Sequence, residues 1–446
     1  MSLRDTARQL RDGTLRSRDL VETCLTHIDE WQPATNAFIE IDAAGARRDA
    51  DAADAELGRG FDRGILHGVP TSLKDLLDQQ GHVTSAGSRS MIDVAAADAP
   101  AVAHLRANGA VFVGRTNMHE FALGTTSEDS GFGAVRHHHD PRHSAGGSSG
   151  GAAVSVATGM SHVAIGSDTG GSVRIPAAAC GLVGLKPAWG EVSLAGVVPL
   201  SPTCDCVGPL ATSVDDAWVT LQALRQDGPL PALPSARAMQ GLSIGVLREF
   251  GWRRVMPEIG AQVSAALDRW AAGGAALQDL PLGTAPTVAA TYSTIVMREA
   301  LDFHTPRLAT HAALYTAAVG GRLQAAARPT DAEYAEALAA RAAIEAEVAA
   351  LLARVDLLAL PGLAITPPPL GQSQVSWPDG EELTRLAMLR LTQPFNLSRH
   401  PAIVLPIGLT TDGWPVSLQL VGRDTPSLVA AALTIERLLG LRDDRG

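Results

Sequence analysis

Two clusters of glycine and serine flank a short apolar stretch in the first half of the chain. They occupy Gly146–Gly151, which reads Gly-Gly-Ser-Ser-Gly-Gly, and Asp168–Arg174, which reads Asp-Thr-Gly-Gly-Ser-Val-Arg. Glycine costs roughly 0.5–1 kcal/mol relative to alanine in regular structure, so such a concentration indicates unusual backbone angles or close approach of a ligand. Serines among these glycines could act as a nucleophile and a proton relay. We interpret the region as a catalytic site.

Ser172 is the stronger candidate for the nucleophile. It follows a predicted strand at residues 162–166 through an Asp-Thr-Gly-Gly turn. Glycines allow backbone N–H groups to point at one spot without a Cβ clash, and such donors stabilise a developing oxyanion by several kcal/mol. The pattern therefore favours chemistry at Ser172 over a simple tight turn.

A serine nucleophile needs a neighbouring group that takes its proton, and histidine is the usual one. The histidines at 137–139 and His143 lie in a predicted loop, where we expect surface or packing roles; a metal site there is the less favoured alternative. Residues 146–150 also match the G-x-S-x-G elbow of α/β-hydrolases. However, residues 140–145 before that match are turn-like, whereas an elbow follows a strand.

Lys74 is an alternative base, placed at the end of a predicted strand. To accept a proton it must be neutral, which requires its pKa to fall from about 10.4 to roughly 7–8 through burial and hydrogen bonding. A lone lysine near an apolar run is more often a surface residue whose stem is buried. The assignment of Lys74 therefore depends on the serine clusters.

Composition excludes several classes of function. The 446 residues are 46% hydrophobic and 19% charged, which is typical of a folded globular protein. The net charge of -11 disfavours direct binding to nucleic acid. The chain has neither a signal-peptide pattern at its N-terminus nor an apolar run of about 18 residues, so we expect a cytoplasmic protein without a membrane span. The four cysteines are too few for a disulfide scaffold, and we expect buried free thiols.

Helix and strand patterns alternate along most of the chain. This alternation predicts an α/β fold: a single large domain, residues 1–446, with a mixed central β-sheet covered by helices on both faces. We divide it into an N-terminal helical segment at 1–62, a core with the glycine-serine clusters at 63–227, and a C-terminal half at 228–446 that completes the sheet. The predicted strands lie at 110–114, 162–166, 242–247, 356–361, 402–406 and 416–421, and a long helix is predicted at 331–354.

Taken together, these segments resemble the amidase signature family over nearly the whole chain. The resemblance rests on Gly68–Pro70 with Lys74 and Asp75, on both glycine-serine clusters, and on Gly181–Pro187. It implies the amidase signature fold and a catalytic set of a lysine, a bridging serine held by a cis peptide bond, and a nucleophilic serine. The matching positions are Lys74, Ser148 and Ser172, and the two serines are 24 positions apart, as the pattern requires.

The resemblance also implies roles for the residues around this set. Backbone N–H groups at Thr169, Gly170 and Gly171 would hold the oxyanion. Ser149, Asp168 and Arg174 would orient the catalytic side chains, and Gly124 and Thr125 would face the substrate. No metal or other cofactor is expected.

Two departures from the family pattern are expected to alter the pocket wall. Ala188-Trp189 replaces a more usual threonine, and Arg399 stands where many relatives carry glycine. A third position, Ile175, bears on function, because the A subunits of tRNA amidotransferases usually carry glutamine there.

We therefore expect an amidase that hydrolyses a small or medium carboxamide through an acyl-enzyme and releases ammonia or an amine. Its expected partner is a small-molecule amide, with no direct contact to nucleic acid or membrane. The sequence leaves open whether the chain forms a homodimer. The alternatives are a glutaminase-like A subunit of a tRNA amidotransferase and an inactive binding or scaffold homologue. The sequence does not identify the natural substrate.

Overall fold

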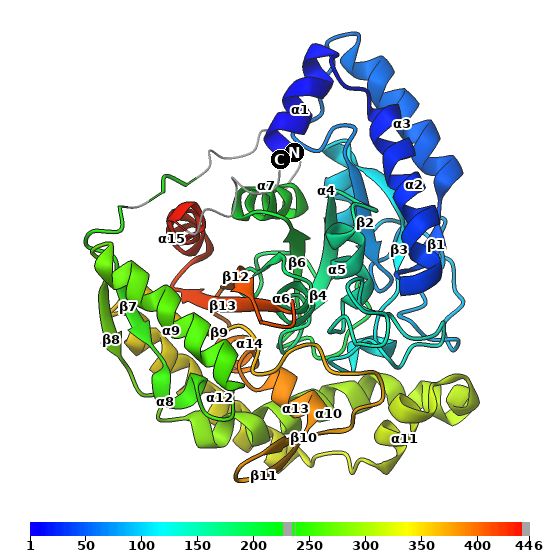
Figure 1. The fold of residues 1–446 in the computed structure, drawn as a ribbon. Helices are drawn as coiled ribbons and strands as arrows, with labels where there is room; N and C mark the ends of the chain where they lie inside the picture. The colour runs from blue at the N-terminus through cyan, green and yellow to red at the C-terminus, as the bar shows by residue number, and fades with distance from the viewer. Residues whose placement is uncertain (226–233, 237, 439–446) are drawn as a thin grey trace.

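The computed structural model describes residues 1–225, 234–236 and 238–438. Its centre is an 11-stranded sheet in the order β1-β3-β2-β4-β6-β5-β12-β13-β9-β7-β8, and β10 and β11 form a separate hairpin (Figure 1). The strands are β1 Phe38–Ile41, β2 Pro70–Lys74, β3 Val111–Thr116, β4 Val163–Asp168, β5 Val183–Lys186, β6 Cys206–Ala211, β7 Ser243–Val246, β8 Ala276–Asp279, β9 Leu357–Pro361, β10 Gln374–Trp377, β11 Gly380–Leu383, β12 Ala402–Leu409 and β13 Pro415–Gly422. Because β2 pairs in parallel with β3 and β4 while β4 pairs antiparallel with β6, the sheet is mixed, as predicted.

Helices cover both faces of the sheet, which confirms the predicted fold class. They are α1 Leu3–Asp12, α2 Ser17–Thr35, α3 Ala43–Leu57, α4 Pro100–Ala107, α5 Gly150–Ala157, α6 Arg174–Ala179, α7 Val214–Arg225, α8 Arg248–Gly251, α9 Pro257–Ala272, α10 Ala285–His311, α11 Ala317–Ala325, α12 Asp331–Leu352, α13 Thr384–Leu389, α14 Pro394–Leu397 and α15 Thr425–Leu438, with 3₁₀ turns at Glu120–Ala122 and Ala312–Leu314. Alternate strand residues face opposite sides. Val163 and Ile165 of β4 join the core packed by α7 and α15, whereas Ala164 joins the core packed by α5 and α6.

The N-terminal segment differs from the prediction. Residues 1–62 were expected to be helical, but α2 and α3 are joined by strand β1, which pairs antiparallel with β3. Asn36 ends α2 in the left-handed conformation, with φ 53°. The next residues include Phe38 and Ile41, apolar types that favour strands. The predicted boundary between residues 227 and 228 lies outside the described residues.

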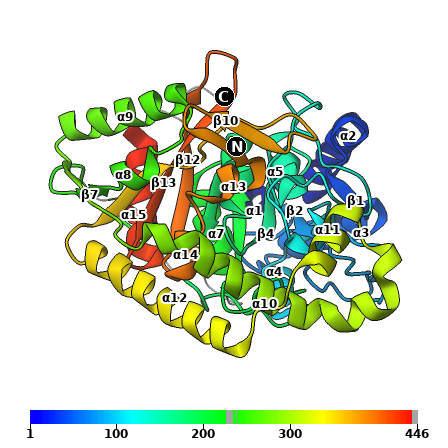
Figure 2. The same cartoon turned by 90° about the horizontal axis from the view of Figure 1, so that it is seen from below.

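The C-terminal half contributes two long helices, of which the sequence patterns predicted one. Figure 2 shows α10 and α12 side by side along one edge of the molecule, with α11, α13 and α14 nearby. The predicted helix at 331–354 corresponds to α12, which begins with a complete Thr330–Glu333 capping box. The 27-residue α10 was not predicted.

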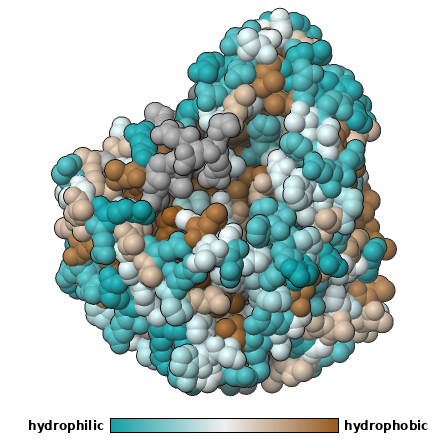
Figure 3. Space-filling view, viewed as in Figure 1, coloured by the Kyte–Doolittle hydropathy of each residue, from teal (hydrophilic) through white to brown (hydrophobic). Residues whose placement is uncertain are grey.

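The surface in Figure 3 is mainly hydrophilic, with hydrophobic side chains scattered over it. Within the described ranges, none of the helices combines the length and the hydropathy that crossing a bilayer requires. All four cysteines are buried and free, as predicted.

A buried ion pair anchors the strand end that carries Lys74. Arg115 of β3 lies beside Asp75, which directly follows β2, and its Nε donates to Asp75 Oδ1 at 2.7 Å. Both side chains are only 1% exposed. The guanidinium also donates to the carbonyl of Leu77 at 2.9 Å, and the Ser85 hydroxyl donates to the Asp75 carboxylate.

We predict that Arg115→Leu lowers the free energy of unfolding by about 3 to 5 kcal/mol, because it leaves a buried carboxylate without its partner. Urea unfolding followed by circular dichroism measures this change. The double variant Arg115→Leu/Asp75→Leu should recover part of the loss, and Arg269→Leu at an exposed position of α9 serves as the control. An unchanged urea midpoint for Arg115→Leu would contradict the prediction.

Candidate active site

Lys74 is the last residue of β2 and is completely buried. Its Nζ lies 2.7 Å from Ser148 Oγ and 2.8 Å from Ser167 Oγ. Burial lowers the pKa of Lys74 to about 7, although the nearby carboxylates of Asp168 and Asp205 act in the opposite direction. The side chain can therefore exist as a neutral amine near neutral pH.

The contacts with Ser148 and Ser167 determine which side of the Lys74 amine can accept a proton. A protonated Lys74 would donate hydrogen bonds to both hydroxyls, whereas the neutral amine has a lone pair that can accept one. With Ser167 as the acceptor of one N–H, the lone pair can face Ser148. This geometry allows the Ser148 hydroxyl to pass its proton to Lys74.

Ser148 lies on a loop whose backbone is held from two sides. The Gly147–Ser148 peptide bond is cis. The carbonyl of Ser148 accepts a hydrogen bond from the backbone N–H of His119 at 3.1 Å and another from Ser127 Oγ at 3.2 Å. Helix α5 begins two residues later, at Gly150. The hydroxyl of Ser148 is thus fixed beside the lysine.

Ser172 lies between β4 and α6, in the turn that the sequence analysis singled out. It is 6% exposed and lines a cavity of about 40 Å³. The backbone N–H of Ser149 donates to the carbonyl of Ser172 at 3.2 Å, so the two glycine-serine clusters are in direct contact. Among the described residues, no hydrogen bond joins the hydroxyls of Ser148 and Ser172. Contacts between catalytic groups are often loose before substrate binds.

The turn before Ser172 leaves backbone donors unused. In the described part of the chain, no hydrogen bond uses the backbone N–H of Thr169, Gly170, Gly171 or Ser172. Unpaired N–H groups are rare in buried backbone and require an explanation. Gly171 has φ 141°, and a Cβ there would clash with the hydroxyl oxygen of Thr392. Only glycine fits at position 171, and the unused N–H groups of the turn are the donors that the predicted oxyanion hole needs.

Behind this turn lies a fully buried ion pair. Arg174 donates from Nη2 to Asp168 Oδ1 at 2.9 Å and from Nε to Oδ2 at 3.0 Å. Burial alone would raise the pKa of Asp168, but the Arg174 guanidinium outweighs this effect and, with Lys186 and Asn396, brings the pKa to about 2. Asp168 is therefore an anion whose charge is compensated by Arg174 and which lies close enough to Lys74 to affect its pKa.

Comparison with known proteins agrees with this geometry. The family model called Amidase matches residues 19–425. The chain therefore belongs to the amidase signature family. It is 32% identical to the A subunit of glutamyl-tRNA(Gln) amidotransferase from Roseiflexus sp. (strain RS-1) over 458 residues, covering 95% of this chain and 93% of that protein.

Solved structures of other family members share the fold. A crystal structure of an amidase superposes with a TM-score of 0.93 at 36% identity and covers 99% of this chain and 100% of that one. The native peptide amidase of Stenotrophomonas maltophilia gives a TM-score of 0.81 at 27% identity, with 99% and 97% covered.

The residues predicted to face the substrate lie beside Ser172 in this family member. Gly124 and Thr125 line the cavity that contains Ser172 and also a larger neighbouring cavity of about 330 Å³. A Cβ at Gly124 would clash with the His119 ring, so glycine is required for the loop to approach that ring. The structure thus brings all eleven predicted site residues to one region; their roles stay predictions.

Sequence reasoning missed several residues of the site. Ser167 holds the lysine, and Ser127 holds the Ser148 loop. Three residues from the C-terminal half contact the Asp168–Arg174 region: the Thr392 hydroxyl donates to the carbonyl of Gly170, Asn396 Nδ2 donates to Asp168 Oδ1, and Gln419 Oε1 accepts from Arg174. Ser167 could have been found, because β2 and β4 are adjacent and Leu73 pairs with Ile165.

A further signal lies in the lysine content. The sequence has two lysines, Lys74 and Lys186, among 36 lysine and arginine residues. Both are completely buried, and all the other members of this set are arginines. Arginine stays protonated in proteins and cannot serve as a base at neutral pH, so only a lysine of this set can supply a neutral amine.

The two departures expected in the pocket wall contact each other instead. The Arg399 guanidinium lies over the Trp189 ring at 4.2 Å, and the backbone N–H of Trp189 donates to the Arg399 carbonyl at 3.0 Å. Arg399 has φ 62°, a conformation that explains why glycine suits this position. Neither residue lines the two cavities beside Ser172.

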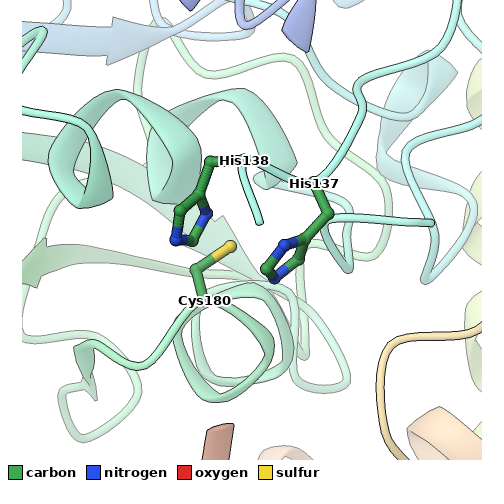
Figure 4. A group of neighbouring side chains, drawn as sticks. All are labelled: His137, His138 and Cys180. Atoms are coloured by element: carbon green, nitrogen blue, oxygen red, sulfur yellow. The ribbon is translucent and has the colours of Figure 1, made fainter. Parts of the chain in front are cut away.

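The histidine loop is more buried than a surface role implies. Figure 4 shows His137 and His138 close to Cys180, with their potential ligand atoms within 4.8 Å of one another. However, His137 Nε2 donates to the carbonyl of Ala179 and its Nδ1 accepts from the N–H of His139, both at 3.0 Å. Burial lowers the pKa of His137 to about 3. With both nitrogens engaged, the neutral ring packs rather than ligates a metal.

We predict that kcat/KM falls as the pH drops below about 7, because protonation of Lys74 removes the base. Lys74→Met should reduce kcat by about 10³-fold at all pH values. With lysine labelled by ¹³C at the ε position, two resonances are expected, and the one missing in Lys74→Met should titrate near pH 7. If the Lys74 resonance kept the chemical shift of a protonated amine up to about pH 10, close to the ordinary pKa of lysine, this assignment would be contradicted.

We predict that Asn396→Ala lowers kcat about tenfold and moves the acidic limb of the rate profile to higher pH by roughly half a unit or more. The amide supports the Asp168–Arg174 pair, and a less compensated Asp168 would favour protonated Lys74. Asn396→Asp, which adds a carboxylate, should move the limb further. If activity fell while the acidic limb of the rate profile kept its wild-type position, Asn396 would have a packing role only.

Proposed function

We propose that this family member is an amidase that hydrolyses the C–N bond of a small or medium carboxamide through an acyl-enzyme on Ser172. The observation that carries the proposal is the 2.7 Å contact between Lys74 Nζ and Ser148 Oγ in a fully buried site. A buried amine whose pKa is lowered to about 7 is a suitable general base near neutral pH. No cofactor is needed for this chemistry.

In the first half of the reaction, Ser172 Oγ attacks the amide carbonyl carbon. Its proton passes to Ser148, and the Ser148 proton passes to Lys74, which becomes an ammonium. The carbonyl oxygen gains negative charge and is bound by the N–H groups at Thr169, Gly170 and Gly171. Lys74 then returns the proton through Ser148 to the leaving nitrogen, the C–N bond breaks, and ammonia or an amine departs.

In the second half, water attacks the ester carbonyl of acylated Ser172. The water proton follows the same route to Lys74 and returns to Ser172 Oγ as the C–O bond breaks. The products are a carboxylic acid and the regenerated enzyme. Ser149, Asp168 and Arg174 would keep the relay aligned, since their hydrogen bonds join the Ser148 loop, β4 and α6.

A second candidate function is that of the glutaminase component of a tRNA amidotransferase. It is favoured by the 32% identity to an amidotransferase protein of which 93% is covered. The presence of Ile175, where such proteins usually carry glutamine, favours the independent amidase. We propose that residues 1–446 act as one amidase domain on a small-molecule amide, without contact to nucleic acid or membrane.

We predict that the purified chain releases ammonia from simple carboxamides and that Ser172→Ala lowers kcat by about 10⁴-fold while the protein stays folded. An enzyme-coupled ammonia assay with a panel of amides and glutamine measures this, and exposed Ser193→Ala is the control. Activity with glutamine that depends on an added partner protein would favour the second candidate. If no amide released ammonia, with or without a partner protein, the chain would be an inactive homologue.

A further inference from the structure

Two arginines line the small cavity that contains Ser172. Arg322 comes from α11 and is partly buried, whereas Arg385 comes from α13 and is exposed. Among the described residues, no carboxylate lies within ion-pair distance of either guanidinium. The cavity is lined by Ala122, Leu123, Gly124, Thr125, Ser172, Leu200, Tyr292, Val296, Arg322, Arg385 and Leu389, none of which is acidic.

The arginines form an uncompensated positive wall. Burial lowers the pKa of Arg322 to about 10, and the neighbouring charge of Arg385 acts in the same direction. Arg322 still carries its charge at neutral pH. Its Nη1 donates to the carbonyl of Leu123 at 3.1 Å, which fixes the side chain but leaves the charge unpaired. A desolvated cation of this kind is stabilised by an anionic ligand.

Two acidic groups, Glu128 and Asp129, line the larger cavity. Glu128 Oε2 accepts the backbone N–H of Gly371 at 2.8 Å. Asp129 lies 3.6 Å from His119 Nε2, and burial raises the pKa of both carboxylates. Arg322 and Arg385 line both cavities. The larger cavity is therefore lined by charges of both signs, while the inner cavity beside Ser172 is lined by positive charge alone.

We propose that the substrate is the monoamide of a short dicarboxylic acid, whose free carboxylate binds Arg322 and Arg385 while its amide carbonyl meets Ser172. This inference rests on the proposed amidase function. The small volume of the inner cavity, about 40 Å³, favours a spacer of a few carbons. Leu200, Val296 and Leu389 provide apolar contacts for such a spacer. Planar guanidinium groups bind carboxylates through paired hydrogen bonds.

The experiment compares kcat/KM for succinamate with that for its neutral methyl ester and for butyramide. The wild type should prefer succinamate by at least about tenfold, and Arg385→Gln should reduce this preference about tenfold, mainly through KM. Arg322→Gln should act in the same direction. Arg269→Gln removes the same charge from the surface of α9, outside the cavity lining, and should leave the preference unchanged.

A binding measurement separates this inference from the proposed function. Calorimetry with succinate and Ser172→Ala protein should show binding that Arg385→Gln weakens about tenfold and Arg269→Gln does not. If the enzyme hydrolyses butyramide and succinamate equally well and succinate does not bind, the carboxylate site is wrong while the amidase proposal stands. If no amide is hydrolysed but succinate binds through the arginines, the amidase proposal is wrong and the anion site stands.

Discussion

The site depends on the ion pair that compensates the negative charge of one buried carboxylate, that of Asp168. Asp168 lies close enough to Lys74 for its charge to favour the protonated amine. Arg174 pairs with Asp168 through two hydrogen bonds and holds the pKa of that carboxyl at about 2 despite burial. Because the arginine supplies the positive charge that Asp168 requires, the lysine is free to be neutral. Without Arg174, the charge of Asp168 would favour the protonated form of Lys74 more strongly.

The rest of the fold follows from holding that pair and the amine in adjacent positions. Strands β2 and β4 are parallel neighbours, so Lys74 at the end of one strand meets Ser167 near the end of the other. The turn after β4 then exposes its N–H groups, and glycine is required where Thr392 packs against it. Asn396 and Gln419 arrive from the C-terminal half and complete the hydrogen bonds of Arg174. The two halves of the chain thus share one buried polar network.

The sequence predicted the parts that depend on local patterns. The strand end at Lys74, the turn before Ser172 and most strands of the core are visible as apolar runs bounded by glycine or proline. Strand β1 was missed because its four residues lie between helical patterns. Asn396 and Arg385 were missed because their roles depend on long-range packing: each belongs to a short C-terminal helix and meets a turn or loop more than 200 positions away. No local pattern records such a contact.

The distribution of lysine and arginine connects catalysis with recognition. Every exposed cation of the described chain apart from the N-terminus and histidines is an arginine, and both lysines are buried. A guanidinium stays charged even where burial lowers its pKa, which suits Arg322 to binding an anion but makes it useless as a base. An amine loses its proton when burial lowers its pKa to about 7, which suits Lys74 to accepting one. The same physical effect, desolvation of a cation, therefore separates the two tasks by side-chain type.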